Sequence, residues 1–197
     1  MDRRKAIKRM GLSFGYLAAT PTVISILESC TKETPISWIP QFFSEEEAIV
    51  IRNLTDLILP PTKNIPGAID VDVPQFIDSY YNEVVEIKER DTFKKGLDLI
   101  LKTLGNKVEN ISTNQYDSLL AKFLNAKKNE IEAFKINEED NLAYHTLTSL
   151  RSKSVWAFKT SQKIGKEVLA YDPVPGVQIG CMPLDEATGG KKWSLMN

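Results

Sequence analysis

The chain is poor in the residues that hold metals and redox centres, with one histidine and two cysteines among 197 residues. The histidine is His145, and the cysteines are Cys30 and Cys181. This set cannot form a structural zinc site or an iron–sulfur cluster by itself, because such sites normally take four Cys or His ligands. The Cys-x-x-Cys-His motif of covalent haem and the Gly-x-Gly-x-x-Gly motif of dinucleotide sites are also missing. We therefore expect no metal and no cofactor in this chain.

Residues for acid–base catalysis are scarce as well. His145 falls in the middle of an expected helix, where two interpretations stay open: a partly buried, hydrogen-bonded histidine or a catalytic one. The acidic runs at 45–47 and 138–140 lie at expected helix N-termini, where they compensate the helix dipole, so they predict no acid–base role. A binding protein is therefore favoured over a small enzyme.

No excess of one charge is present, since 25 basic and 26 acidic residues give a net charge of −1. The segment before Cys30 has five basic and two acidic residues, which leaves 20 basic and 24 acidic residues and a net charge of −4 for the remainder. A mildly acidic surface gives no reason to expect nucleic acid as a partner. With 42% hydrophobic and 9% aromatic residues, the chain has the composition of an ordinary folded domain.

The N-terminal segment has the layout of an export signal. Arg3 and Arg4 begin a basic region, and an uncharged stretch from Met10 to Leu27 follows. The paired arginines and the weakly hydrophobic stretch resemble a twin-arginine (Tat) signal more than a general secretory one, although Asp2 departs from the usual pattern. This resemblance predicts export of a folded protein to the bacterial cell envelope.

A possible lipid attachment site follows the signal. Residues 27–30, Leu-Glu-Ser-Cys, resemble a bacterial lipobox, in which cleavage leaves an N-terminal cysteine that carries lipid. Multiple acyl chains on Cys30 would hold the protein at a membrane surface without a spanning helix. Two alternatives remain: Cys30 is an ordinary cysteine, or residues 10–27 form an uncleaved anchor.

The remaining sequence predicts a tether followed by one helical domain. We expect an export signal over 1–29, a tether over 30–41 and a single domain over 42–197. Helical spacing of apolar residues and start signals predict five helices, from Ser44 to the Pro60–Pro61 pair, from Asp72, from about Asp91 to Gly105, from Ser112, and from Asn137. The fold class is mainly α, an irregular helical bundle with an extended C-terminal segment rich in Pro and Gly.

Two segments resemble the gluconate 2-dehydrogenase subunit 3 family. The first is residues 54–62, Leu-Thr-Asp-Leu-Ile-Leu-Pro-Pro-Thr, followed by Pro-Gly-Ala at 66–68 and Val-Pro-Gln-Phe-Ile-Asp at 73–78. The second, looser segment includes Gly-Lys-Glu-Val-Leu at 165–169, Tyr-Asp-Pro-Val-Pro-Gly at 171–176, Gly-Cys at 180–181 and the stretch from 190 to Trp193. The resemblance extends from Phe42 to Trp193.

The resemblance implies a small, non-catalytic subunit of a membrane-associated sugar or sugar-acid dehydrogenase. In such complexes a flavoprotein of the glucose–methanol–choline type holds FAD, and a cytochrome c subunit with haem often accepts the electrons. The small subunit commonly carries the Tat signal for the flavoprotein, which would explain an export signal for folded proteins on a chain without a cofactor motif. The rival interpretation is a stand-alone envelope lipoprotein that acts as a helical binding or scaffolding module.

Two segments are candidates for the partner surface, the loop over 60–73 and the irregular C-terminal run over 173–193. Both are rich in Pro and apolar residues without regular periodicity, and Pro lowers the ordering entropy that docking would cost. The alternative is that the C-terminal run covers the domain's own core. The candidate contact residues are Pro60, Pro61, Pro66, Gly67, Pro74, Phe76, Tyr171, Pro173, Pro175, Gly176, Cys181 and Trp193. For Cys181 we favour a small buried thiol over an intermolecular disulfide.

Overall fold

The computed structural model describes residues 36–105, 107–172, 176 and 179–194. The chain divides into two units, residues 1–37 and 38–197, and the described helices all belong to the second unit. The predicted signal residues Arg3 and Arg4 and the candidate lipid site Cys30 lie outside the described residues.

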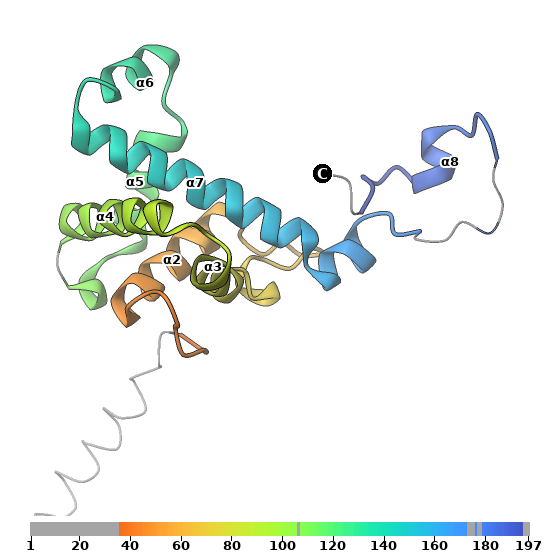
Figure 1. Ribbon diagram of the computed structural model, residues 1–197. Coiled ribbons are helices and arrows are strands. Elements are labelled where there is room, and N and C mark those ends of the chain that lie inside the picture. Colours follow the sequence, from red (N-terminus) through yellow and green to blue (C-terminus); the bar gives the residue numbers. More distant parts are fainter. Residues whose placement is uncertain (1–35, 106, 173–175, 177–178, 195–197) are drawn as a thin grey trace, which may run out of the picture. The chain divides into compact units, whose positions relative to one another are not determined.

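The described part of the second unit is built from helices and connecting loops (Figure 1). The α-helices are α2 (Glu45–Ile58), α3 (Val73–Glu83), α4 (Ile87–Leu104), α5 (Thr113–Leu124), α6 (Lys128–Phe134), α7 (Glu138–Thr160) and α8 (Leu184–Thr188). Short turns of 3-10 helix are η1 (Ile69–Val71) and η2 (Val108–Asn110), and η3 (Ile164–Val168) is a π-helical turn. Within the described residues there is no strand, and Ala170 and Trp193 form an isolated parallel β-bridge. The prediction of a mainly α fold is confirmed.

Local capping explains where three helices begin. The Ser44 hydroxyl accepts a hydrogen bond from the Glu47 amide at 3.2 Å, and the Glu47 carboxylate accepts one from the Ser44 amide at 2.6 Å. At α5 the Ser112 amide donates to the side chain of Gln115 at 2.9 Å. At α7 the Asn137 side chain accepts from the next turn's amides. These bonds satisfy amides that lack a partner within the helix, and the predicted starts are confirmed.

The structure differs from the sequence-based expectation at several elements. Helix α4 begins at Ile87 and not near Asp91, because its first turn is polar and the apolar stripe starts only at Phe93. The short helices α6 and α8 were not expected, since seven and five residues are too few for a clear apolar period.

The core lies where α7 packs against α2, α3, α4, α5 and α6, as Figure 1 shows for the long central helix. Its largest fully buried side chains are Tyr81, Tyr116, Ile51, Leu54, Ile77, Leu97, Ile100, Leu147, Leu150 and Ile164. Burying one large apolar side chain stabilises a fold by about 1.5–3 kcal/mol. Leu57 and Ile58, in the last turn of α2, are only half-buried. None of the described helices has the combination of length and apolar character that crossing a membrane requires.

Candidate partner interface

The described residues offer little that could do chemistry. Among them, no group of three His, Cys, Asp or Glu side chains is placed to hold a metal ion. His145 is exposed on α7, where its ring meets Tyr144 at 5.5 Å between centroids, so the interpretation as a partly buried histidine is wrong.

The loop between α2 and α3 is tightly folded. The Ala68 amide donates to the Leu59 carbonyl at 2.8 Å, and the Gly67 amide donates to the Asp70 carboxylate at 2.7 Å. A Cβ at position 67 would lie 2.7 Å from Cδ of Pro61, closer than real Cβ contacts come. The close approach of the two loop arms thus requires glycine at this position.

The candidate contact residues of this region divide into two groups. Pro60, Pro61 and Phe76 are exposed and Pro66 is half-buried, so their surfaces can meet a partner. Gly67 and Pro74 are buried. The prediction that Gly67 and Pro74 contact a partner is therefore wrong, because the chain itself covers their atoms. They shape the loop and the first turn of α3 instead.

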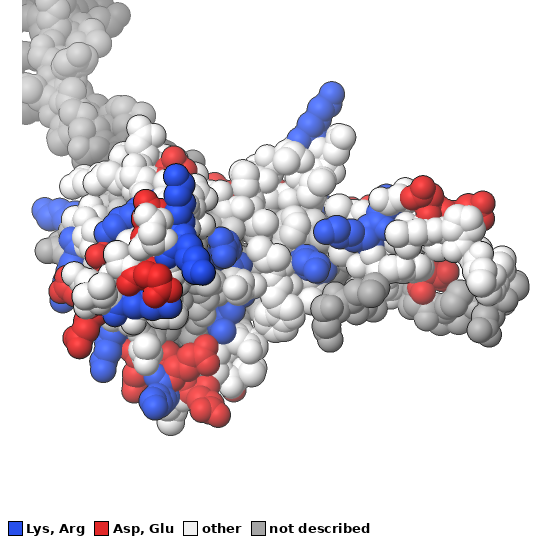
Figure 2. All heavy atoms as spheres, turned by 90° about the horizontal axis from the view of Figure 1, so that it is seen from above, with Lys and Arg blue, Asp and Glu red and all other residues white. Residues whose placement is uncertain are grey.

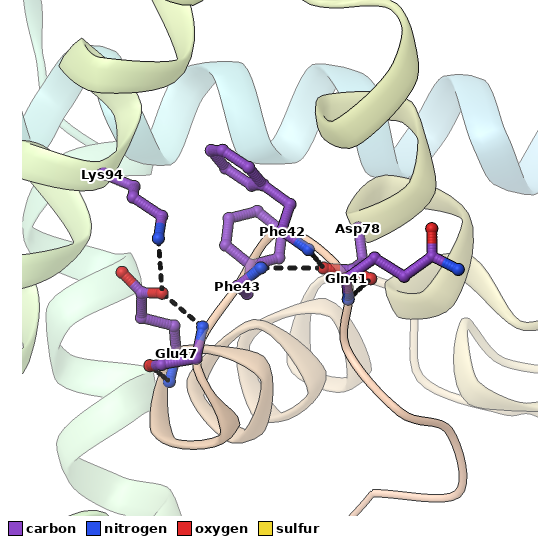
Figure 3. A network of polar contacts seen from close by, with 7 residues as sticks. Gln41, Phe42, Phe43, Glu47, Asp78 and Lys94 are labelled. Carbon is purple, nitrogen blue, oxygen red and sulfur yellow. Dashed lines mark hydrogen bonds and ion pairs between the residues drawn. The ribbon is translucent and has the colours of Figure 1, made fainter.

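The last residue of the first signature segment, Asp78, has a structural role as a buried carboxylate. Asp78, on α3, is fully buried and accepts three backbone hydrogen bonds (Figure 3). Its Oδ2 accepts from the Gln41 amide at 2.8 Å, and its Oδ1 accepts from the Phe42 and Phe43 amides at 3.1 and 3.0 Å. Three amides that precede the start of α2 are satisfied in this way. We call this arrangement the Asp78 clamp.

A second buried carboxylate holds the same stretch from the other side. Glu47, 5% exposed, accepts from the Ser44 amide and lies 3.7 Å from Nζ of Lys94 on α4 (Figure 3). The Lys94 ammonium also lies 4.9 Å from the centroid of the Phe42 ring. The segment that enters the domain is thus attached to α2, α3 and α4 together.

An aromatic cluster packs against this segment. Tyr81 is fully buried. Its ring centroid lies 4.4 Å from that of Phe93 and 5.7 Å from those of Phe42 and Phe43. Burial raises the pKa of the Tyr81 hydroxyl above its ordinary value of 10.0, because the phenolate would lose its hydration. Burial also raises the pKa of the Tyr116 hydroxyl.

These raised pKa values predict alkaline destabilisation. Below the ordinary tyrosine pKa both the folded and the unfolded chain hold the protons, so the full stability is present there. Above it, the unfolded chain releases protons that the folded chain keeps, so the free energy of unfolding should fall as pH rises from about 10. Urea unfolding between about pH 8 and 11 measures this. Tyr81→Phe should flatten the dependence, and an unchanged slope in that variant would contradict the assignment.

The opposite side of α3 carries aromatic side chains that remain accessible. Phe76 is 40% exposed, and on α7 Trp156 is 42% exposed. Their ring centroids lie 5.2 Å apart, edge to face, and Tyr80 lies 5.2 Å from Trp156. We call Phe76, Tyr80 and Trp156 the α3–α7 aromatic face.

The C-terminal run pairs with the segment that follows η3. The Ala170 amide donates to the Lys192 carbonyl at 2.9 Å, and the Ser194 amide donates to the Ala170 carbonyl at 2.8 Å. This pairing leaves Trp193 half-buried, beside an open cleft that Lys159 and Thr188 also line. Trp193 thus packs in part on its own domain.

Other candidate contacts in this run are open to solvent. Tyr171, Gly176 and Cys181 are exposed. The expectation of a buried thiol at Cys181 is therefore wrong. Pro173 and Pro175 lie outside the described residues.

On the face of the molecule seen in Figure 2, charges of both signs are mixed. Figure 2 shows Lys and Arg side chains interspersed with Asp and Glu over the visible helices, with no field of one sign. The described ion pairs include Lys122 with Asp140 at 2.7 Å and Lys153 with Glu89 at 3.2 Å. Surface pairs of this kind contribute about 0–1 kcal/mol each. Recognition by this surface would depend on shape and apolar contact more than on net charge.

The described part is thus a helical domain on which aromatic and proline side chains are accessible. The chain matches the family described as gluconate 2-dehydrogenase subunit 3 over residues 45–176, more than half of its length. The chain belongs to this family. The comparisons found no matching curated protein and no matching solved structure.

Proposed function

We propose that this chain is the non-catalytic small subunit of a FAD-containing dehydrogenase of the glucose–methanol–choline type. It binds the catalytic subunit, escorts it through Tat export and stabilises it at the cell envelope. The observation that carries the proposal is the family match over 45–176, which covers the packed helices α2 to α7. The twin arginines at positions 3 and 4 support the export step, because a Tat substrate crosses the membrane folded and can carry a docked partner.

The remaining parts of the proposal concern the anchor and the electron acceptor. Lipid on Cys30 would hold the complex at the membrane, and a cytochrome c subunit would take electrons from the flavin. The substrate of the complex is a sugar or sugar acid by analogy with the family description. A stand-alone envelope lipoprotein is the alternative, supported by the lipobox-like residues 27–30 and the charged tether after them.

Purification from the native host tests the proposal. A full-length chain with a C-terminal tag should bring down one oxidoreductase-sized protein in stoichiometric amount, with the absorbance spectrum of FAD. A colourless chain recovered alone under gentle conditions would favour the stand-alone lipoprotein.

A charge-preserving change of the signal separates escort from simple association. Replacing Arg3 and Arg4 by lysine should leave both proteins in the cytoplasm as a complex, since Tat recognition needs the arginine pair while the docking surface is unchanged. Cell fractionation with flavin detection measures this. If the catalytic subunit still reaches the envelope in this variant, the chain is not its escort.

Removing residues 172–197 tests the C-terminal run. The core helices end at Thr160, so we expect the midpoint of thermal unfolding to change by only a few degrees, while recovery of the flavoprotein falls severalfold. Undiminished recovery by a folded truncated chain would show that this run only covers its own domain.

A further inference from the structure

Helix α3 has apolar residues on two sides, and the α3–α7 aromatic face includes the side that points away from the core. Helix α3 turns Val73, Ile77 and Tyr81 into the core, and these side chains are at most 1% exposed. On its other side, Phe76, Tyr80 and Val84 follow at intervals of four residues, so they lie along one line of the helix. Phe76 is 40% and Val84 is 62% exposed. Helix α3 and its C-cap Val84 thus carry a second apolar side, which the domain buries only in part, since Tyr80 is half-buried.

The geometry of the face is held in place before any partner arrives. Phe76 stacks on Tyr80 with centroids 6.1 Å apart, and both rings meet Trp156 at 5.2 Å. Helices α3 and α7 pack directly on each other, so the three rings are carried by the rigid part of the fold. Rigid aromatic side chains bind with little loss of entropy and dominate the energetics of protein interfaces.

The charges around the face indicate what kind of partner covers it. Lys153 has its Nζ 5.5 Å from the Tyr80 centroid and is paired with Glu89. Glu83 and Glu86, beside Val84, are exposed. On α7 the edge of the face also carries Lys153 and the exposed Lys159, one turn from Trp156. An apolar aromatic centre with charges of both signs at its edge is the arrangement found in protein–protein interfaces, so a protein partner with an apolar pocket fits this face.

The range of the family match points to the same kind of partner. All residues of the face lie inside 45–176, whereas Cys181, α8 and Trp193 lie outside it. We expect the surface for a partner common to the family in the part of the chain that the family shares, and the C-terminal run then adds contacts of its own. We propose that the α3–α7 aromatic face docks the catalytic dehydrogenase subunit, an inference that rests on the proposed function.

The test uses the tagged full-length chain in the native host. The combined change Phe76→Ala and Trp156→Ala should lower recovery of the FAD-containing subunit by about tenfold or more. The matched control is Ile136→Ala, an 87% exposed apolar residue just after α6, which should recover the flavoprotein like the parent. Circular dichroism and thermal unfolding of the purified variants should match the parent. The single change Trp156→Phe, which keeps an aromatic ring, should retain part of the binding if the double variant is less stable.

Each other outcome overturns the inference in a distinguishable way. Equal flavoprotein recovery by the parent and the folded double variant removes the face from the interface but leaves the proposed function standing. If the parent chain brings down no flavoprotein, both fail. A purified chain that is dimeric, and monomeric after Trp156→Ala, would assign the face to a second copy. The last outcome concerns binding to phosphatidylglycerol vesicles, measured in a Cys30→Ser background that cannot carry lipid. If Trp156→Ala abolishes this binding, the aromatic face is a membrane contact.

Discussion

Replacing Asp78 by alanine should lower the free energy of unfolding by about 4 kcal/mol, because it leaves the amides of residues 41–43 without their acceptor. Asp78 is fully buried, so water does not readily substitute for the lost oxygens. Asp78→Asn keeps the size of the side chain and one acceptor oxygen. That oxygen can still serve Phe42 and Phe43, whereas the Gln41 amide would face an NH₂ group, and we expect a loss of about 2 kcal/mol.

Asp70 provides the matched control for this experiment. Its carboxylate accepts one hydrogen bond, from the Gly67 amide, and the residue is exposed. Asp70→Ala should therefore cost only about 1 kcal/mol. Urea unfolding of the purified chain measures all three variants. If Asp78→Ala lowers the free energy of unfolding by no more than Asp70→Ala does, the clamp contributes little.

The Asp78 clamp also links two parts of the proposed mechanism. The carboxylate sits on α3, two residues after Phe76, and binds the backbone through which the predicted tether enters the domain. Loss of the clamp should therefore loosen the attachment of the tether to the helix that carries the aromatic face. In the native host we expect Asp78→Asn to reduce flavoprotein recovery less than the double change at Phe76 and Trp156.

Replacing Gly96 by alanine should destabilise the chain by about 2 kcal/mol, although alanine is the better helix former by about 1 kcal/mol. Gly96 lies on α4 where the helix meets α7. A Cβ there would lie 1.9 Å from Oγ1 and 2.8 Å from Cβ of Thr146. Thr146 is 3% exposed and donates to the Leu142 carbonyl at 2.8 Å, so moving its hydroxyl away from the new Cβ would break a buried hydrogen bond. The two helices would have to separate.

A double-mutant cycle identifies the cause. Thr146→Ala removes the nearest atom, so Gly96→Ala should cost less in that background than in the parent, by about 1 kcal/mol or more. Gly176→Ala is the control, because no atom of the described residues lies within 4 Å of the added Cβ, and it should change stability by less than about 0.5 kcal/mol. Thermal unfolding of the parent, the two single variants and the double variant completes the cycle. A Gly96→Ala variant more stable than the parent would refute the close helix contact.

Prediction from sequence succeeded where the signal is local and failed where it is not. The capping bonds of Ser44, Ser112 and Asn137 join residues two or three positions apart, so the helix starts could be read directly. The end of α4 at Leu104, before Gly105 with its φ of 99°, was predicted for the same reason. The exposure of His145 and Cys181 was predicted wrongly, because burial depends on which elements pack over a residue.

The amino-acid sequence by itself determined the helical class of this domain, the starts of α2, α5 and α7, and its family, because apolar spacing, caps and signature segments are properties of short stretches. Only the tertiary structure decided the roles of Asp78, Gly96 and the α3–α7 aromatic face. Asp78 binds amides 35 to 37 positions away, Gly96 meets Thr146 across two helices, and Trp156 meets Phe76 from another helix. No local sequence pattern predicts such contacts, because the paired residues are far apart in the chain. The contacts form only when α7 packs against α3 and α4, and when α3 packs against the segment before α2.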